Sequence, residues 1–210
     1  MTDTLSPVVR IVDDEETVRS SERFVLRLAG IDSVCYESAE DMLAHEDFRA
    51  PGCIVLDLRM DGMSGLELQE ELARKGCDLP IVFLSGHGSI NAAVWALKKG
   101  AEDFLEKPVR PEKLQAIVRG LIERNIAGRE RRARLEEKRR LFLSLTPRER
   151  DILRAVAVGA LNKQIALDLG IAEQTVKIHR SNALHKLQLR TAVDAHEFLT
   201  AIGEMPEAQP

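Results

Sequence analysis

The sequence predicts an α/β fold, a doubly wound parallel sheet of (βα)5 type, followed by a linker helix and an all-α domain of four helices. Three observations support this prediction. Over residues 1–120, short apolar runs alternate with amphipathic stretches, as in strands joined by crossover helices. Residues 121–144 are rich in Arg and Glu, and only helical patterns follow them. Because each crossover must pack across the sheet, helices are expected on both of its faces.

Five strands and five helices are expected to alternate in the first domain, residues 1–120. The predicted strands are Val8–Val12, Ser33–Tyr36, Cys53–Leu56, Ile81–Leu84 and Asp103–Leu105. The predicted helices are Thr17–Ala29, Ala39–Glu46, Gly65–Lys75, Ile90–Lys99 and a last one from Glu112 onward. Gly30, Gly76 and Gly100 each follow a helical stretch, where a residue that tolerates positive φ ends the helix.

Residues 121–144 form the predicted linker, which contains no proline and is able to continue the preceding helix as far as Leu143. A spacing of seven connects Leu114, Leu121, Leu135 and Phe142, as in a coiled coil, but Gly128 occupies the middle position. A solvated linker helix is the preferred interpretation, and a paired coiled coil stays open as the alternative.

The run Thr146-Pro147-Arg148-Glu149 indicates the start of a new domain, because it has the form of a capping box with proline in the first turn. The helices expected after it are Pro147–Val158, Asn162–Leu169, Glu173–Leu187 and Val193–Ile202. The predicted output domain is therefore 145–203, and residues 204–210 are expected to be a flexible tail.

Composition is that of a globular protein, with 44% hydrophobic residues and a net charge of −4. The charge is unevenly distributed: residues 1–120 hold 14 basic against 22 acidic residues, and residues 121–210 hold 16 against 12.

No apolar run approaches the length of a membrane span, and the N-terminus lacks the features of a signal peptide, so we expect a cytoplasmic protein with no membrane partner. The three cysteines are far apart and lack metal-ligand spacing, which indicates reduced packing residues.

Polar residues follow four of the predicted strands directly. Asp13 and Asp14 follow the first, Asp57 the third, Ser85 the fourth, and Lys107 lies just beyond the fifth. Because the carboxyl ends of parallel strands open onto one edge of the sheet, these side chains are expected to meet in one pocket. Three neighbouring carboxylates repel one another, and a hard divalent cation such as Mg²⁺ is the usual remedy. An Asp nucleophile here would form an acyl phosphate, with an ammonium group neutralising the phosphoryl oxygens.

These residues resemble the receiver domains of bacterial two-component response regulators over almost all of residues 5–120. The matching motifs are Val-Asp13-Asp14-Glu, Leu-Asp57-Leu-Arg-Met, Leu-Ser85-Gly-His-Gly and Glu-Lys107-Pro. The resemblance implies a flavodoxin-like fold, with Asp57 accepting a phosphoryl group from a sensor histidine kinase.

The same resemblance implies a role for each residue of the pocket. Mg²⁺ would be coordinated by Asp14, Asp57 and the backbone carbonyl of Arg59, and Asp13 would hold it through water. Ser85 and Lys107 would contact the phosphoryl oxygens, and Phe104 would be the switch aromatic. One departure is visible, because Asp61 stands where related sequences often have proline, which affects the expected loop rigidity and the lifetime of the phosphoryl group.

Residues 162–187 have the form of a helix-turn-helix, with Gly170 in the turn. At 100° per residue, Val176, Ala183, Leu184 and Leu187 fall on one side of the second helix. The opposite side includes Lys177, Ile178 and Ser181, and the exposed apolar Ile178 is able to contact a thymine methyl group. The alternative to DNA contact is that this side of the helix simply faces solvent.

Motifs between Leu145 and Leu187 resemble the four-helix DNA-binding domain of the LuxR/NarL/FixJ group, and the resemblance covers residues 145–202. The whole chain is most similar to the FixJ-like subgroup. Carried over by position, Lys177, Ile178 and Ser181 would face base edges. Phosphate contacts would come from Lys163, Thr175, His179 and Arg180. The last helix resembles the family's dimer-forming helix.

The sequence therefore predicts a phosphorylation-dependent transcriptional regulator that binds double-stranded promoter DNA. It is expected to form a homodimer on phosphorylation and to interact with RNA polymerase. The only chemistry expected of it is Mg²⁺-dependent self-phosphorylation and self-dephosphorylation. Two alternatives stay open: a phosphohydrolase with an Asp nucleophile, which the order of the motifs disfavours, and a phosphoryl sink or protein-binding adaptor that does not bind DNA.

Overall fold

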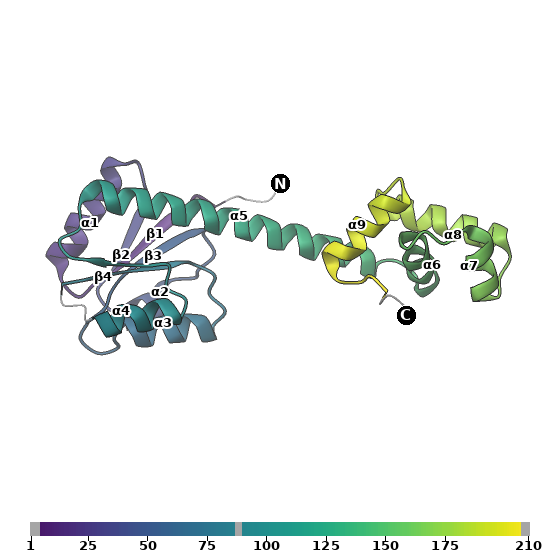
Figure 1. The fold of residues 1–210 in the computed structure, drawn as a ribbon. Coiled ribbons are helices and arrows are strands. Elements are labelled where there is room, and N and C mark those ends of the chain that lie inside the picture. Colours follow the sequence, from purple (N-terminus) through teal and green to yellow (C-terminus); the bar gives the residue numbers. More distant parts are fainter. Residues whose placement is uncertain (1–4, 87–89, 207–210) are drawn as a thin grey trace. The chain divides into compact units, whose positions relative to one another are not determined.

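The computed structural model describes residues 5–86 and 90–206. It divides the chain into two compact units, residues 1–129 and 130–210, which we call the N-terminal and C-terminal units (Figure 1). Two sequence predictions fall partly outside the described residues: His87 and Gly88 of the Ser-Gly-His-Gly motif, and residues 207–210 of the expected tail.

The N-terminal unit contains a five-stranded parallel sheet with the order β2-β1-β3-β4-β5. The strands are β1 Val8–Val12, β2 Ser33–Tyr36, β3 Gly52–Asp57, β4 Ile81–Ser85 and β5 Asp103–Glu106. The helices are α1 Glu16–Leu28, α2 Ala39–His45, α3 Gly65–Arg74, α4 Ile90–Lys98 and α5 Pro111–Leu143. The predicted (βα)5 order is confirmed, and the strand ends lie within one residue of the prediction.

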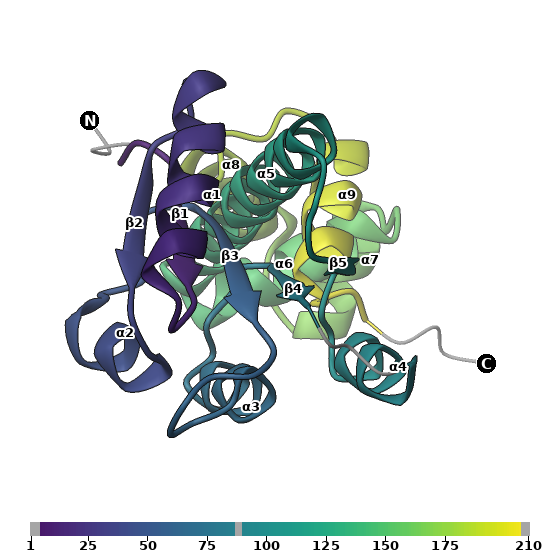
Figure 2. The same ribbon diagram turned by 90° about the vertical axis from the view of Figure 1, so that its left-hand side faces the viewer.

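Side chains alternate between the two faces of the sheet, and each face has its own core. In β3, Ile54 and Leu56 pack with residues of α2, α3 and α4, whereas Cys53 and Val55 pack with residues of α1 and α5. Figure 2 shows these two helix layers on opposite sides of the sheet. Burial on both faces explains why the central strands are apolar throughout, as expected for a parallel sheet.

Helix α5 continues without interruption into the predicted linker, as expected, and ends at Leu143. The residues spaced by seven are used for packing within the units. Leu114 and Leu121 are buried in the N-terminal unit, and Phe142 is buried in the C-terminal unit with Leu135 against it. These side chains are therefore not left for a second helix, which favours the linker helix over the coiled coil.

Two side chains of α5, one helical turn apart, anchor it to loops at the amino ends of the strands. Asn125 accepts a hydrogen bond from the Gly52 amide at 3.1 Å and donates to the Asp78 carbonyl at 2.8 Å. The Arg129 guanidinium donates to the Asp78 carboxylate and to the carbonyls of Phe48 and Arg49. We call Asn125 and Arg129 the α5 clamp; it fixes the helix to the sheet beyond residue 120.

The C-terminal unit contains four helices after α5: α6 Pro147–Ala157, α7 Asn162–Leu169, α8 Glu173–Lys186 and α9 Ala192–Ile202. Gly170 ends α7 with φ of +62°, a left-handed conformation suited to glycine, and the chain turns directly into α8. The apolar sides of these helices form two clusters, one around Phe198 and Leu199 and one around Ile152 and Val176. The predicted helix-turn-helix is confirmed.

The predicted capping box begins α6. The Glu149 amide donates to Thr146 Oγ1 at 3.3 Å, and the Thr146 amide donates to Glu149 Oε2 at 2.8 Å. Lys186 of α8 also donates to both Glu149 oxygens at 2.8 Å, so the capping residue of α6 is hydrogen-bonded to α8 as well.

Among the described residues, no helix is both long and apolar enough to cross a membrane.

Candidate functional site

The register of the sheet brings the predicted pocket residues to one edge. Asp57 lies opposite Leu84, and Ser85 lies opposite Glu106, so β3, β4 and β5 end at nearly the same level. Asp13 follows directly after β1. The strand ends border a cavity of about 850 Å³, and its lining includes Asp14, Asp57, Arg59, Ser85 and Lys107. Residues separated by almost a hundred positions thus meet, as the sequence predicted.

Lys107 joins two carboxylates that come from different strands. Its Nζ atom donates to Asp13 Oδ2 at 2.5 Å and to Asp57 Oδ1 at 2.6 Å. Its backbone amide donates to the Ser85 carbonyl at 2.9 Å, which holds the residue beside β4. The sequence predicted a fixed ammonium group near Asp57, but its simultaneous contact with Asp13 was not predicted.

Asp57 is 92% buried, and burial raises the pKa of its carboxyl group. Hydrogen bonds from Lys107 and from the Arg59 amide, the latter at 2.6 Å, act in the opposite direction, and the pKa is raised overall. For Lys107, burial lowers the pKa, but the bonds to Asp13 and Asp57 outweigh burial and the pKa is raised. The pair therefore favours an ionised Lys107 beside a carboxylate that is poorly solvated.

The β3–α3 loop reaches the site through a close backbone approach. A Cβ atom on Gly65 would lie 2.1 Å from the Asp57 carbonyl oxygen, so only glycine fits there. In the same loop, the Asp61 amide donates to Asp14 Oδ2 at 3.2 Å. Proline has no amide hydrogen, so a proline at position 61 could not donate this bond. Asp61 thus connects the loop to an acidic residue of the pocket, a consequence the sequence did not reveal.

The donor set suits a hydrated Mg²⁺ ion. Asp14 is exposed, lines the same cavity as Asp57 and Arg59, and offers hard oxygen ligands with them. Within the described residues, no three His, Cys, Asp or Glu side chains gather as a complete metal site. That finding is compatible with Mg²⁺, because this ion usually retains several waters and binds one or two carboxylates.

Ser85 ends β4, and Phe104 lies on the neighbouring β5. Ser85 is buried and lines the same cavity as Asp57. Phe104 is half-buried and packs against Phe83, with ring centroids 6.2 Å apart, in the core beneath α2, α3 and α4. Its role as a switch stays a prediction.

Sequence reasoning missed one acidic residue of the cavity, Glu22 of α1. Its side chain is buried, and it lines the cavity together with Val18 and Val25. Burial, and next the charge of Asp13, raise the pKa of Glu22 to about 8. The signal was present in the sequence, because Glu22 lies four residues after Val18 and four before Leu26, on the apolar side of an amphipathic helix.

The predicted DNA-contact residues lie on α7 and α8. Lys177, Ile178 and Ser181 are exposed on α8, opposite the buried Val176 and Ala183, as the angular pattern predicted. Ile178 is 53% exposed, which folding alone does not require.

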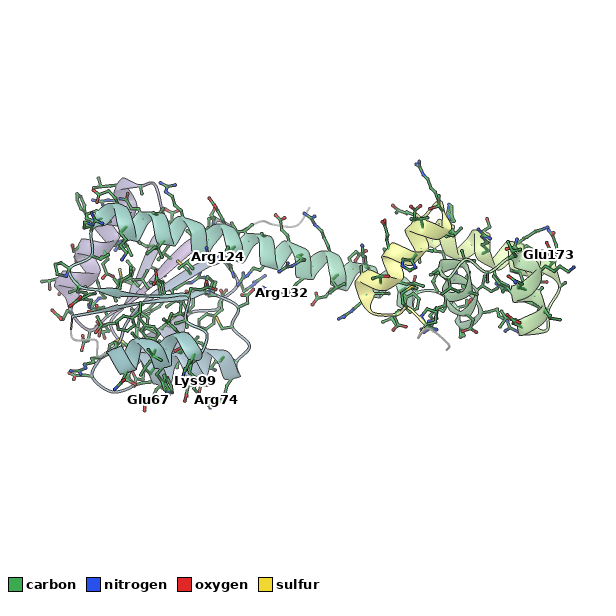
Figure 3. All side chains as sticks on the ribbon, viewed as in Figure 1. Glu67, Arg74, Lys99, Arg124, Arg132 and Glu173 are labelled. Carbon is green, nitrogen blue, oxygen red and sulfur yellow. The ribbon has the colours of Figure 1, made fainter. Side chains whose placement is uncertain are left out.

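The residues expected at phosphates differ in their surroundings. Lys163 is exposed, whereas Thr175, His179 and Arg180 are half-buried. Arg180 donates to Asn162 at 3.0 Å. Lys177, one of the residues expected at base edges, pairs with Glu173, which Figure 3 labels on α8, at 3.2 Å. Arg180 and Lys177 are therefore positioned by neighbours before any DNA binds.

Comparison with known proteins identifies both units. Residues 9–119 match the family "Response regulator receiver domain", and residues 143–199 match "Bacterial regulatory proteins, luxR family". These matches favour a regulator over the phosphohydrolase alternative.

Several proteins are similar to this chain over almost its whole length. Nodulation protein W of Bradyrhizobium diazoefficiens is 39% identical over 93% of this chain and 86% of its own. Transcriptional regulatory protein FixJ of Azorhizobium caulinodans is 40% identical over 94% of both chains. The solved structure of response regulator StyR is 40% identical, covers 93% of this chain and 98% of its own, and superposes with a TM-score of 0.87. The chain therefore belongs to the two-component response regulators that combine a receiver domain with a LuxR-family DNA-binding domain, and it is a transcriptional regulator.

Proposed function

We propose that Asp57 accepts a phosphoryl group from a sensor histidine kinase and that this modification controls promoter binding. The observation that supports the proposal most directly is the 2.6 Å contact between Lys107 Nζ and Asp57 Oδ1 in the shared cavity. Receiver domains generally use Mg²⁺ for phosphorylation. Here Asp14, Asp57 and the Arg59 carbonyl would hold the ion, with Asp13 holding it through water. When bound, it supplies charge neutralisation for the phosphoryl oxygens.

In the proposed transfer, an Asp57 carboxylate oxygen attacks phosphorus. The bond from phosphorus to the kinase histidine nitrogen breaks as the new P–O bond forms, and the imidazole leaves with the electron pair. Lys107 would donate to one phosphoryl oxygen and the Ser85 hydroxyl to another. Hydrolysis of the resulting acyl phosphate by water returns the Asp57 carboxylate and inorganic phosphate, which resets the switch.

Phosphorylation would bias a two-state receiver rather than create a new fold. Movement of Ser85 toward the phosphoryl group would open space beside β4 for Phe104, and the surface formed by 90–99 and 103–106 would repack. We propose that this surface change promotes a homodimer, which brings two helix-turn-helix domains to adjacent half-sites.

On promoter DNA, α8 would enter the major groove. Lys177, Ile178 and Ser181 would face base edges, and Lys163, Thr175, His179 and Arg180 would contact phosphates. The dimer would act on RNA polymerase at the promoter, and the whole cycle would take place in the cytoplasm, where bacterial DNA is located.

The decisive experiment replaces the phosphoacceptor. Asp57→Asn keeps the shape of the side chain but removes the nucleophilic carboxylate, so acyl-phosphate formation from a phosphorylated kinase or from acetyl phosphate should disappear. The phosphorylation-dependent gain in promoter affinity should disappear with it, as measured by fluorescence anisotropy on a promoter duplex. Asp32→Asn, the same change at an exposed position outside the cavity lining, is the control and should leave both intact. Retention of phosphorylation by Asp57→Asn would refute the proposal.

A further inference from the structure

The carboxyl group of Glu22 is a buried acid without a partner among the described residues. It is 7% exposed, and none of the described residues forms a hydrogen bond or an ion pair with it. A buried carboxyl group without a partner is favoured in its neutral form, because desolvation of an unpaired charge is costly, and a bound cation would stabilise the ionised form. Glu22 borders the 850 Å³ cavity, so its open side is the cavity and not the protein core.

The walls near Glu22 are mainly apolar and come from two helices and the loop before the second. Val18 and Val25 of α1, Val109 of the loop and Leu114 of α5 all line the cavity. Gln115 of α5 donates to the Val25 carbonyl at 2.9 Å, which connects the two helices beside this part of the lining. The result is a pocket with apolar sides, an acidic group between them and an open mouth toward Asp57. The whole cavity, of about 850 Å³, falls in the range of about 300 to 1,000 Å³ that is typical of small-molecule sites.

The charges of the lining indicate which kind of ligand the pocket would accept. Five lining side chains are acidic, Asp14, Glu15, Glu22, Asp57 and Asp61, and two are basic, Arg59 and Lys107. Lys107 forms its hydrogen bonds with Asp13 and Asp57 and acts on Glu22 only through its charge. An anion would be repelled here, whereas a cation would give Glu22 the partner that the protein does not supply.

We propose that this part of the cavity, the Glu22 pocket, binds a small organic cation, an ammonium group carried on a short apolar chain or ring. The ammonium group would donate to the Glu22 carboxylate, and the apolar part would lie against Val18, Val25, Val109 and Leu114. The pocket opens into the same cavity as Asp57, so an amine bound there and the state of Asp57 would affect each other reciprocally. The inference concerns binding alone and does not depend on the proposed phosphorylation of Asp57.

Benzylamine is a suitable probe, and benzyl alcohol and benzoate are its neutral and anionic counterparts. Binding would be followed by amide chemical shifts of the isotopically labelled full-length protein, in excess Mg²⁺ so that Asp14 and Asp57 are not competing sites. Benzylamine should cause saturable shifts in α1 and at the start of α5, with a dissociation constant of about a millimolar or below, as for fragment-sized ligands. Benzyl alcohol should bind at least about tenfold more weakly, the loss expected for one charge-assisted hydrogen bond, and benzoate should not bind.

The matched variants separate a specific pair from general attraction to an acidic surface. Glu22→Gln preserves side-chain shape and should weaken benzylamine binding about tenfold or more, whereas Glu15→Gln removes the same charge from an exposed position on the cavity lining and should change it less than about threefold. Equal binding of benzylamine to the unmodified protein and to Glu22→Gln would overturn the proposal. Equal binding of benzylamine and benzyl alcohol by the unmodified protein would overturn it too, without any use of a variant.

Discussion

The ammonium group of Lys107 shows how far single residues could be predicted from the sequence. Its position after the fifth strand indicated that it would reach Asp57, because parallel strands end at one edge of a sheet. Its second contact, with Asp13 at 2.5 Å, depends on side-chain directions that spacing does not specify. Glu22 was missed for a related reason. Its spacing of four from Val18 and Leu26 marks the apolar side of α1, but a single glutamate in an amphipathic helix normally indicates the solvated side, and this expectation hid the signal.

Glu22 also has a measurable effect on stability. The pKa of its carboxyl group is about 8 in the folded protein and has an ordinary value of 4.5. The folded state therefore holds the proton more tightly than the unfolded chain. Between pH 4.5 and pH 8 the free energy of unfolding therefore falls as pH rises, by at most about 1.4 kcal/mol for each pH unit.

Glu22→Gln removes this titration, so the variant should gain stability relative to the unmodified protein as pH rises from 5 to 8. We expect a difference that is small at pH 5 and reaches about 1 to 3 kcal/mol at pH 8. Urea denaturation of both proteins at several pH values measures it. Glu15→Gln, at an exposed position, should show no such trend, and a Glu22→Gln difference that stays constant from pH 5 to 8 would contradict the assignment.

At the level of helices and strands, prediction from the sequence was accurate because local signals and burial agreed. Strand ends were within one residue of the prediction, and the capping box at Thr146 fixed the start of α6. The α5 clamp was not predicted. From the sequence, Asn125 only interrupts a coiled-coil pattern, because its partners, Gly52 at the start of β3 and Asp78 in the loop before β4, are distant in sequence.

The α5 clamp should contribute to the stability of the receiver domain. Arg129→Ala removes the hydrogen bonds to Asp78, Phe48 and Arg49, so we expect a loss of about 1 to 3 kcal/mol and faster amide exchange in residues 122–129. Denaturant unfolding and hydrogen exchange measure the two effects. Arg134→Ala, on the same helix but with a mostly exposed side chain paired to Glu130, is the control and should change neither. Equal effects of the two substitutions would mean that the clamp has no special role.

The cap of α6 gives a prediction for acid stability. Glu149 is 3% exposed; burial raises its pKa, but hydrogen bonds from Lys186 and Thr146 outweigh burial, and the pKa is lowered overall. A lowered carboxyl pKa means that the stabilisation is present above the ordinary value of 4.5 and is lost as pH falls through the lower folded value.

Glu149→Gln should therefore destabilise the C-terminal unit by about 1 to 3 kcal/mol at pH 7, and by less near pH 3. Thermal unfolding followed by circular dichroism at both pH values provides the measurement. Glu67, which forms the same type of capping box in α3 at an exposed position, is labelled in Figure 3. Glu67→Gln should have the smaller effect at pH 7, and the reverse order would show that burial and Lys186 do not strengthen the cap.

At the scale of the whole molecule, function was predictable because two independent motif sets identify two domains, and the family matches cover both. The division of charge is consistent with this arrangement. Residues 1–120 hold an acidic excess, so the cations that meet DNA must come from the C-terminal half. In the C-terminal half, Lys186 is already bound to the buried Glu149. The number of basic side chains on α7 and α8 that can contact DNA phosphates is therefore smaller than the composition indicated. Counting charges in the sequence does not reveal this loss, because it depends on the contact between α6 and α8.

The salt dependence of DNA affinity tests whether phosphorylation works by adding a second output domain to the DNA. Each phosphate contact contributes about −0.9 to the slope of log K against log salt, so a dimer on two half-sites should have about twice the slope of a monomer on one. We expect the acetyl-phosphate-treated protein to show this doubled slope on a duplex selected from a random library, and Asp57→Asn to keep the smaller slope under the same treatment. Because mutations confined to the receiver leave the cations of α7 and α8 unchanged, a change in slope reports the number of bound output domains. A tighter complex with an unchanged slope would mean that phosphorylation strengthens the contacts of one domain, and the proposed dimer would then be wrong.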